Sequence, residues 1–201
     1  MGEFDVVVVG SGSAGSTAAI TAARNGATVA LVERHGFLGG TSTAVLDTFY
    51  GFYTPGSPSR KIVGGVPDEV VGALGELGGV IERPNSFGAG TGVTYHPEYL
   101  KVVWERLARA AGVRVFLYAT VQDVIQRDGR VMELLVATKA GLRTLRAALV
   151  VDASGDADVC HFAGFGYEVA GELEPAQTLT TTFKMCNVDI GRRGGISKAE
   201  L

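Results

Sequence analysis

Three glycines near the start of the chain have the spacing of a dinucleotide-binding turn. Gly10, Gly12 and Gly15 follow the apolar run 4–9 in the order G-x-G-x-x-G. In such a turn the first glycine permits a tight bend, and the second lets a pyrophosphate approach the backbone. The third lets the following helix pack close to the strand. This chemistry is the binding of a dinucleotide cofactor, and the alternative is an ordinary glycine turn of an α/β protein.

The residues after the glycine turn are expected to open a helix. The amides of Ser13 and Ala14 would then lie at the helix N-terminus. Free N–H groups and the helix dipole favour a phosphate at that position. We therefore predict that Ser13 and Ala14 contribute to the cofactor site.

An acidic residue closes the second apolar run, 28–33. The Glu33 carboxylate can accept both hydrogen bonds of an adenosine ribose, and it would repel the 2′-phosphate of NADP. Arg34 favours NADP instead, because an arginine after this strand can bind a 2′-phosphate. The alternative is that Arg34 is a surface charge without such a role. We give Glu33 more weight, since its position is the diagnostic one. The fingerprint by itself does not separate FAD from NAD.

The sequence resembles the FAD-dependent oxidoreductase family related to the glutathione-reductase and fumarate-reductase flavoproteins. The segments that carry the resemblance are 5–15, 29–34, 38–42, 95–98 and 150–158. The resemblance covers nearly all of the chain and implies that the cofactor is FAD. An NAD dehydrogenase domain remains the alternative, although it would more often continue as simple βα repeats than as an antiparallel meander.

Family resemblance also implies further contacts to FAD. One segment would pass beside the pyrophosphate and ribityl chain, and it consists of Gly39, Gly40, Thr41 and Ser42. The backbone of Val121 would read the adenine edge. A last segment would close over the cofactor at the end of the final strand, and it consists of Ala153, Ser154, Gly155 and Asp156. Asp156 and Asp158 are also candidates to cap the next helix.

These residues need an α/β frame to bring them together. We expect a Rossmann-like FAD/NAD(P)-binding fold of three layers, with a parallel sheet, an antiparallel β-meander and part of a substrate domain. Helices are predicted from 13 to about 25, over 66–77 and over 97–111. Strands are predicted over 4–9, 28–33, 113–118, 121–126, 131–138, 142–147, 149–152 and 177–188. Asp128-Gly129 and Ala140-Gly141 are the expected hairpin turns.

Two domains are predicted, and each is built from two separate stretches of the chain. Residues 1–45 and 97–165 are expected to form the FAD-binding domain, and 46–96 and 166–201 a partial substrate or cap region. Ser197 and Glu200 have the spacing of a helix capping box at the end of the chain. This spacing suggests a longer protein with a missing C-terminal portion.

No catalytic residue can be named. Asp47, Tyr50 and Tyr53 lie in an aromatic stretch that could face the flavin, but a packed aromatic cluster is favoured. The three histidines have no visible acid–base partner: His35 could contact adenosine or lie on the surface, His96 precedes a helix, and His161 lies within one. Cys160 and Cys186 form no C-x-x-C motif, so we predict no metal site.

Composition limits the partners. The 201 residues are 46% hydrophobic with a net charge of −3, and no basic run exceeds two residues, which argues against nucleic acid. No apolar run approaches the roughly 18 residues of a membrane helix. We expect a cytoplasmic protein that acts on a small molecule, and a homo-oligomer is one expected arrangement. A truncated, non-catalytic flavoprotein subunit that needs a partner chain is the further alternative.

Overall fold

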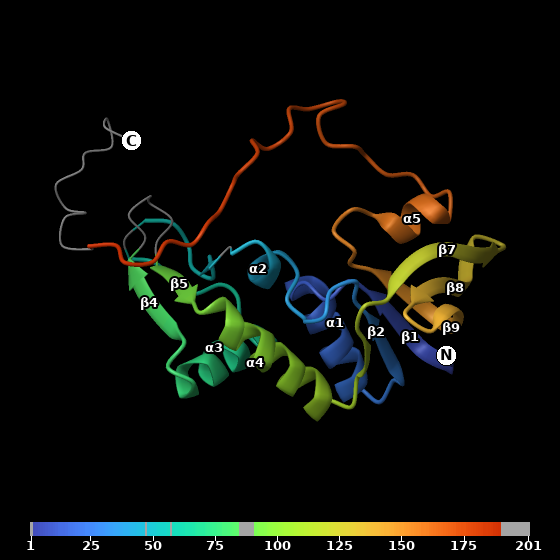
Figure 1. The fold of residues 1–201 in the computed structure, drawn as a ribbon, viewed down its shortest axis with the longest axis horizontal. Coiled ribbons are helices and arrows are strands. Elements are labelled where there is room, and N and C mark those ends of the chain that lie inside the picture. The colour runs from blue at the N-terminus through green and yellow to red at the C-terminus, as the bar shows by residue number, and fades with distance from the viewer. Residues whose placement is uncertain (1, 47, 57, 85–90, 190–201) are drawn as a thin grey trace.

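A six-stranded mixed sheet is the larger sheet of the fold and lies at the right of Figure 1. The computed structural model describes residues 2–46, 48–56, 58–84 and 91–189. The strand order is β6-β2-β1-β9-β8-β7. The strands are β1 (Gly2–Val9), β2 (Val29–Val32), β6 (Arg114–Phe116), β7 (Thr120–Arg127), β8 (Arg130–Thr138) and β9 (Gly141–Asp152). Strands β6, β2, β1 and β9 run parallel, whereas β7, β8 and β9 form an antiparallel meander.

Strand β9 belongs to both parts of the sheet. It pairs antiparallel with β8 through residues 141–146 and parallel with β1 through residues 145–152. The prediction of two strands over 142–147 and 149–152 was wrong in this respect. Only Ala148 separates them, and alanine does not form a turn, so the extended backbone continues. This continuity ties the meander rigidly to the strand that ends at the candidate site.

Alternate side chains of the parallel strands enter two separate cores. Val8 and Leu31 face one cluster with helices α1 (Ser13–Arg24) and α4 (Pro97–Ala110). Val7, Val9 and Ala30 face another, with the meander and the short helix α5 (Asp158–Phe162). Strands covered on both faces are expected to be apolar throughout, as the run 6–9 is. The predicted three-layer α/β fold is confirmed by this arrangement.

Helix boundaries follow local signals in the sequence. Gly26, at a φ of +92°, follows the end of α1 in the left-handed conformation that glycine tolerates. Pro97 occupies the first turn of α4, and Glu98 lies at the positive end of its dipole. His96 is the N-cap residue but makes no side-chain capping bond, and its ring stacks on Tyr99 at 4.6 Å.

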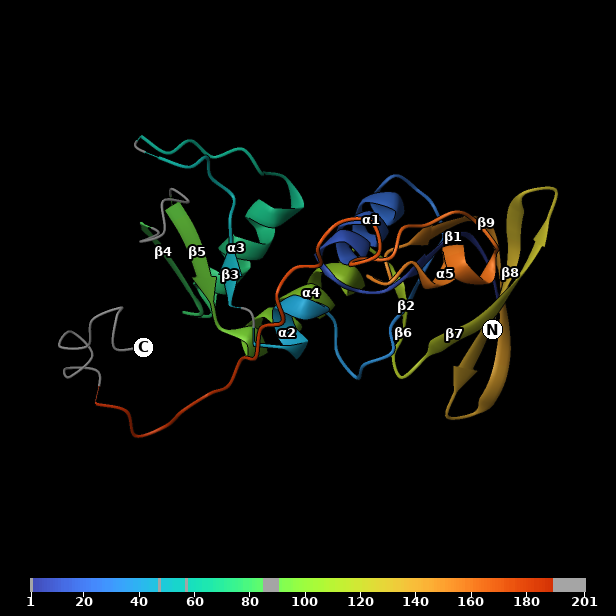
Figure 2. The same ribbon diagram turned by 90° about the horizontal axis from the view of Figure 1, so that it is seen from above.

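A second, three-stranded sheet lies beyond α4 (Figure 2). It contains β3 (Phe49–Tyr50), β5 (Thr91–Tyr95) and β4 (Val80–Pro84) in that order, all antiparallel. Helix α3 (Val66–Glu76) packs against both α4 and β4, and the short α2 (Thr41–Ala44) packs against α4. The sequence did not predict these three strands or α2. The strands are short, and Gly92 and Pro84 weaken the local β signal.

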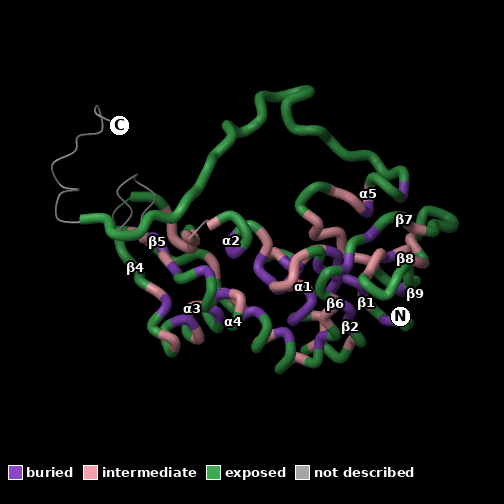
Figure 3. The backbone as a smooth tube through the Cα atoms, in the orientation of Figure 1, coloured by how far each residue is buried: buried purple, intermediate pink, exposed green. Residues whose placement is uncertain are grey.

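The chain from 166 to 189 contains no strand, so the prediction over 177–188 was wrong. Apolar side chains there, including Leu179 and Phe183, are exposed (Figure 3). A strand requires a neighbouring ladder, and this segment pairs with none of the described strands. The predicted capping box at Ser197 and Glu200 lies outside the described residues. None of the described helices has the length and apolar character needed to cross a membrane.

Candidate cofactor-binding site

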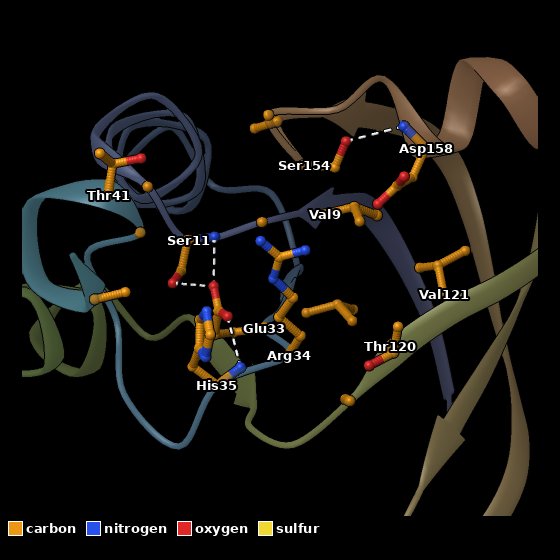
Figure 4. Close-up of a pocket in the computed structure, with 18 of the residues that line it drawn as sticks. Val9, Ser11, Glu33, Arg34, His35, Thr41, Thr120, Val121, Ser154 and Asp158 are labelled. Atoms are coloured by element: carbon orange, nitrogen blue, oxygen red, sulfur yellow. Dashed lines mark hydrogen bonds between the residues drawn. The ribbon is translucent and has the colours of Figure 1, made fainter. Parts of the chain in front are cut away.

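A cavity of about 380 Å³ opens at the carboxyl ends of β1, β2 and β9, beside the start of β7 (Figure 4). Open α/β sheets bind ligands at this edge, because loops and helix N-termini converge there. Ten predicted cofactor residues line it: Gly10, Gly12, Glu33, Arg34, Gly40, Thr41, Val121, Ala153, Ser154 and Gly155. The tertiary structure therefore gathers segments separated by up to 145 positions.

Six predicted residues do not line the cavity: Ser13, Ala14, Gly15, Gly39, Ser42 and Asp156. Ser13 and Ala14 form the exposed first turn of α1 beside it. Gly15 and Ser42 are buried, so their contribution is to packing. Gly39 donates its N–H to the Ser11 carbonyl at 2.9 Å, which fixes the double-glycine segment against the first turn.

Glu33 is held by three hydrogen-bond donors. The Ser11 amide and hydroxyl donate to Oε2 at 3.0 and 2.5 Å, and the His35 amide donates to Oε1 at 2.7 Å (Figure 4). Ser11 is fully buried and Glu33 is 4% exposed. A carboxylate accepts about four hydrogen bonds, so one acceptor position stays open for a ligand without displacing a protein donor.

Sequence reasoning missed Ser11 and left His35 undecided. Ser11 stands at the first variable position of the glycine fingerprint, and its hydroxyl was the available signal. His35 lines the cavity, with its ring stacked on Phe37 at 5.4 Å. The Lys101 ammonium lies 4.0 Å from the Phe37 centroid. The stacking of the His35 ring on Phe37 depends on the bends that follow β2, and no local sequence pattern predicts those bends.

The glycines form a backbone cradle. A Cβ on Gly10 would overlap the Ala153 carbonyl, and a Cβ on Gly40 would lie 2.7 Å from the Gly12 Cα. Gly12 itself has open space at the position of a Cβ. The bare surface over Gly12 is thus available for a ligand group to approach the main chain.

Arg34 pairs with a carboxylate from the opposite side of the site. Its guanidinium lies 3.8 Å from Asp156, in the loop after β9. Both side chains are more than half exposed, so this ion pair contributes little to stability. The guanidinium is free to exchange Asp156 for an anionic ligand at small cost.

Asp152 organises the loop that follows β9. Its carboxylate accepts hydrogen bonds from the Ser154 amide and hydroxyl at 3.1 and 2.7 Å and from the Cys160 amide at 3.0 Å. The Ser154 hydroxyl oxygen accepts from the Asp158 amide at 3.0 Å. The amides in the first turn of α5 therefore donate to the side chains of Ser154 and Asp152, rather than to those of Asp156 or Asp158.

Acid should weaken this loop. Burial raises the pKa of Asp152, but the hydrogen bonds from Ser154 and Cys160 outweigh it, so the pKa lies below its ordinary value of 3.8. The stabilisation is therefore fully present above about 3.8 and is lost as pH falls through the lower, folded-state pKa. We expect Asp152→Asn to cost about 1 kcal/mol at pH 7 and less near pH 2, since the carboxylate is partly exposed.

Urea unfolding at both pH values measures this difference. Ser154→Ala removes one donor to the same carboxylate and also the acceptor of the Asp158 amide, so the part of its cost that changes with pH should be smaller and of the same sign. An Asp152→Asn cost that does not change between pH 7 and pH 2 would contradict the assignment.

The other candidates lie outside the cavity. Tyr50 stacks on Phe52 at 5.1 Å and contacts Tyr95 at 4.5 Å, so a packed aromatic cluster is present. The Tyr53 hydroxyl donates to Glu82 at 2.8 Å. His161 Nδ1 lies 2.8 Å from the Tyr167 hydroxyl on the exposed end of α5. Asp47 lies outside the described residues.

Known proteins resemble this chain in sequence. The family model described as FAD dependent oxidoreductase matches residues 5–199. A thiamine thiazole synthase of Pyrococcus horikoshii is 30% identical over 182 residues, which cover 85% of this chain and 66% of that protein. A thiamine thiazole synthase of Methanothermobacter thermautotrophicus is 33% identical over 161 residues, covering 76% and 56%. The chain thus spans less than two thirds of these relatives.

Solved structures share the fold. THI4 of Thermovibrio ammonificans superposes with a TM-score of 0.54 at 26% identity, covering 80% of this chain and 61% of that one. CabE, an aromatic hydroxylase from angucycline biosynthesis, gives a TM-score of 0.58 at 23% identity, covering 81% and 33%. The second likeness concerns the fold alone.

Proposed function

We propose that this chain, which belongs to the FAD-dependent oxidoreductase family, is the cofactor-binding part of a flavoenzyme that transfers electrons between FAD and a small molecule. Membership of this family confirms the prediction that the cofactor is FAD rather than NAD. The activity of the whole protein is part of the proposal, because the chain spans less than two thirds of its relatives.

One observation carries the proposal. The buried Glu33 carboxylate, held in one orientation, and the open backbone surface over Gly12 at the N-terminus of α1 line the same cavity. Glu33 supplies an acceptor for ribose, and the open surface over Gly12 leads to the N-terminus of α1. An adenosine ribose next to a pyrophosphate requires this combination. The residues present therefore fit the adenosine half of FAD.

The remaining residues would complete the binding of FAD. Ser13 and Ala14 offer helix N-terminal amides to the pyrophosphate, Val121 offers backbone groups to adenine, and Arg34 offers a cation. Two segments would flank the cofactor: 39–42 and 153–156. When bound, the flavin supplies hydride and single-electron transfer, while the protein binds and orients it.

Equilibrium binding of FAD to the purified chain tests the proposal. We expect the flavin absorbance to be retained after dialysis at about one FAD per chain, and ADP to compete with it. NADH should displace it no better than ADP does, because the two share only the ADP half of the site. No retention after addition of FAD, or tight NADH binding in its place, would refute the proposal for this chain.

Ser11 is expected to tune affinity for the adenosine half. Ser11→Ala removes the shortest hydrogen bond to Glu33 and should weaken FAD and ADP binding by roughly 10-fold, as expected for a bond to a charged group. FMN, which lacks adenosine, serves as the second ligand. Ser16→Ala is the matched control, because its buried hydroxyl donates to the Ser11 carbonyl and not to Glu33.

Calorimetric titration of each variant with FAD, ADP and FMN measures these affinities. We expect Ser11→Ala to lose affinity for ADP and to leave that for FMN unchanged, and Ser16→Ala to change neither. Equal losses in the two variants would indicate a general packing effect.

A second candidate is formation of a thiazole. The two sequence relatives described above carry the name thiamine thiazole synthase, and one is aligned over 85% of this chain. Expression of the chain in a bacterium that lacks its thiazole synthase tests this candidate. Growth without added thiazole would favour it over the electron-transfer proposal.

Organisation and location belong to the same proposal. The separation of residues 1–45 with 97–165 from residues 46–96 is supported by the two separate sheets, whereas the assignment of 166–201 to the second unit stays a prediction. Cytoplasmic location is supported by the two free cysteines. A small-molecule substrate suits the family, and a homo-oligomer or a partner chain stays a prediction.

A further inference from the structure

A second cavity, of about 340 Å³, lies on the side of α1 that faces α3 and β3. Its lining comes from α1, the segment 50–63, α3 and α4. The lining residues are Ser13, Ala14, Thr17, Tyr50, Phe52, Val63, Pro67, Val70 and Trp104. None of them lines the cofactor cavity, although Ser13 and Ala14 are also the residues whose amides we assign to the pyrophosphate. The two cavities are therefore distinct and meet only at the first turn of α1.

The lining is aromatic and carries no charged side chain. Tyr50 is fixed between Phe52, at 5.1 Å, and Tyr95, at 4.5 Å. Trp104 is 2% exposed and belongs to the large core of the helical layer. Rigid ring walls favour a flat, apolar ligand, and a charged ligand would be desolvated there without a counter-charge.

The few polar groups of this cavity are hydroxyls, each of which can donate one hydrogen bond and also accept. The Ser13 and Tyr50 hydroxyls lie 3.3 Å apart, a weak mutual contact. Thr17 adds a further hydroxyl to the lining. A lining hydroxyl without an acceptor gains a hydrogen bond from a ligand oxygen, so the site favours a ligand with an acceptor oxygen.

We propose that this second cavity binds a small, uncharged aromatic compound with a carbonyl or hydroxyl oxygen. Its volume lies near the lower end of ordinary small-molecule pockets, which suits a single substituted ring. The inference goes beyond FAD binding and does not depend on it. Thus a chain that binds no FAD but binds the aromatic probe would refute the proposed function and leave this site intact.

Benzamide and benzoate are suitable probes because they share a shape and differ in charge. Trp104 is the single tryptophan of the chain, so its fluorescence reports on this cavity directly. Saturation-transfer NMR gives a readout that does not depend on Trp104. We expect saturable binding of benzamide and at least roughly 10-fold weaker binding of benzoate, because an unpaired charge is costly to desolvate.

Thr17→Phe should fill the cavity and abolish benzamide binding in the NMR assay without affecting FAD retention. Thr21→Phe, one turn further along α1 and exposed, is the matched control and should bind benzamide normally. Val63→Phe fills the cavity from another wall if Thr17→Phe fails to fold. Circular dichroism and thermal unfolding establish that each variant is folded.

Three results would overturn the inference. They are failure of the wild-type chain to bind benzamide, equal binding of benzoate, and unchanged benzamide binding when Thr17→Phe and Val63→Phe are both folded. Size-exclusion chromatography adds a further test. A wild-type dimer that Thr17→Phe converts to monomer, without benzamide binding, would assign the cavity to a contact between chains.

Discussion

A Gly12→Glu variant is expected to fold as the wild type does and to bind no measurable FAD. Gly12 has no atom near the position of a Cβ, and its φ of −58° suits any residue. It is the N-cap of α1, where a carboxylate interacts favourably with the helix dipole. The apo fold should therefore tolerate the change, whereas the pyrophosphate meets a like charge.

The expected loss of affinity is large. Two like charges about 4 Å apart near a protein surface repel by roughly 4 kcal/mol, which corresponds to about a thousandfold in affinity. We expect at least ~100-fold weaker FAD binding, allowing for rearrangement of the new side chain. Dialysis with FAD and thermal unfolding without FAD measure binding and folding separately.

Gly12→Gln is the charge control for this experiment. It has almost the same volume as Gly12→Glu, so the difference between them isolates repulsion from steric blockage. We expect Gly12→Gln to bind FAD weakly but better than Gly12→Glu. Stoichiometric FAD in a folded Gly12→Glu variant would show that the pyrophosphate lies elsewhere.

A Gly15→Ala variant should be destabilised by about 3 kcal/mol or more, at the upper end of what overpacking costs. A Cβ on Gly15 would overlap the carbonyl of Gly10 and lie 3.1 Å from the Ala153 Cβ. The colliding carbonyl belongs to the backbone of the glycine turn, so no side-chain rotation relieves the overlap. The result runs against helix propensity, which favours alanine over glycine by about 1 kcal/mol.

Gly72→Ala is the matched control. Gly72 lies inside α3, and a Cβ there would meet nothing within 4 Å. We expect it to stabilise the chain by about 0.5–1 kcal/mol. Chemical denaturation of the apo chain compares the two variants. Equal effects of Gly15→Ala and Gly72→Ala would show that α1 does not approach β1 and β9 as closely as described.

Elements with strong local signals were predicted well. The first strand, the helices that became α1, α3 and α4, and the Asp128-Gly129 turn follow from apolar periodicity, proline and glycine. The strands of the small sheet and the continuity of β9 were missed. Their extended backbone depends on pairing with strands distant in sequence, which a local pattern does not encode.

The candidate site shows the same division. Local spacing identified the glycine fingerprint, and the end of the second strand identified Glu33, because each role depends on backbone geometry within a few residues. Family resemblance supplied the segments 39–42 and 153–156. Ser11 was not predicted, because its role requires the end of β2 to lie beside the glycine turn, where its hydroxyl donates to the Glu33 carboxylate.

The sequence by itself determined the cofactor-binding turn, the acidic residue and the three-layer α/β fold. Hydrophobic patterning and turn chemistry act over short distances, and these features need little more. Only the tertiary structure decided that Ser11 and His35 hold Glu33, that Ser154 serves α5, and that an uncharged aromatic cavity lies beside α1. The Ser11 contact and the cavity join segments that are distant along the chain, whereas the His35 and Ser154 contacts are local but depend on loop conformations that the packed fold fixes.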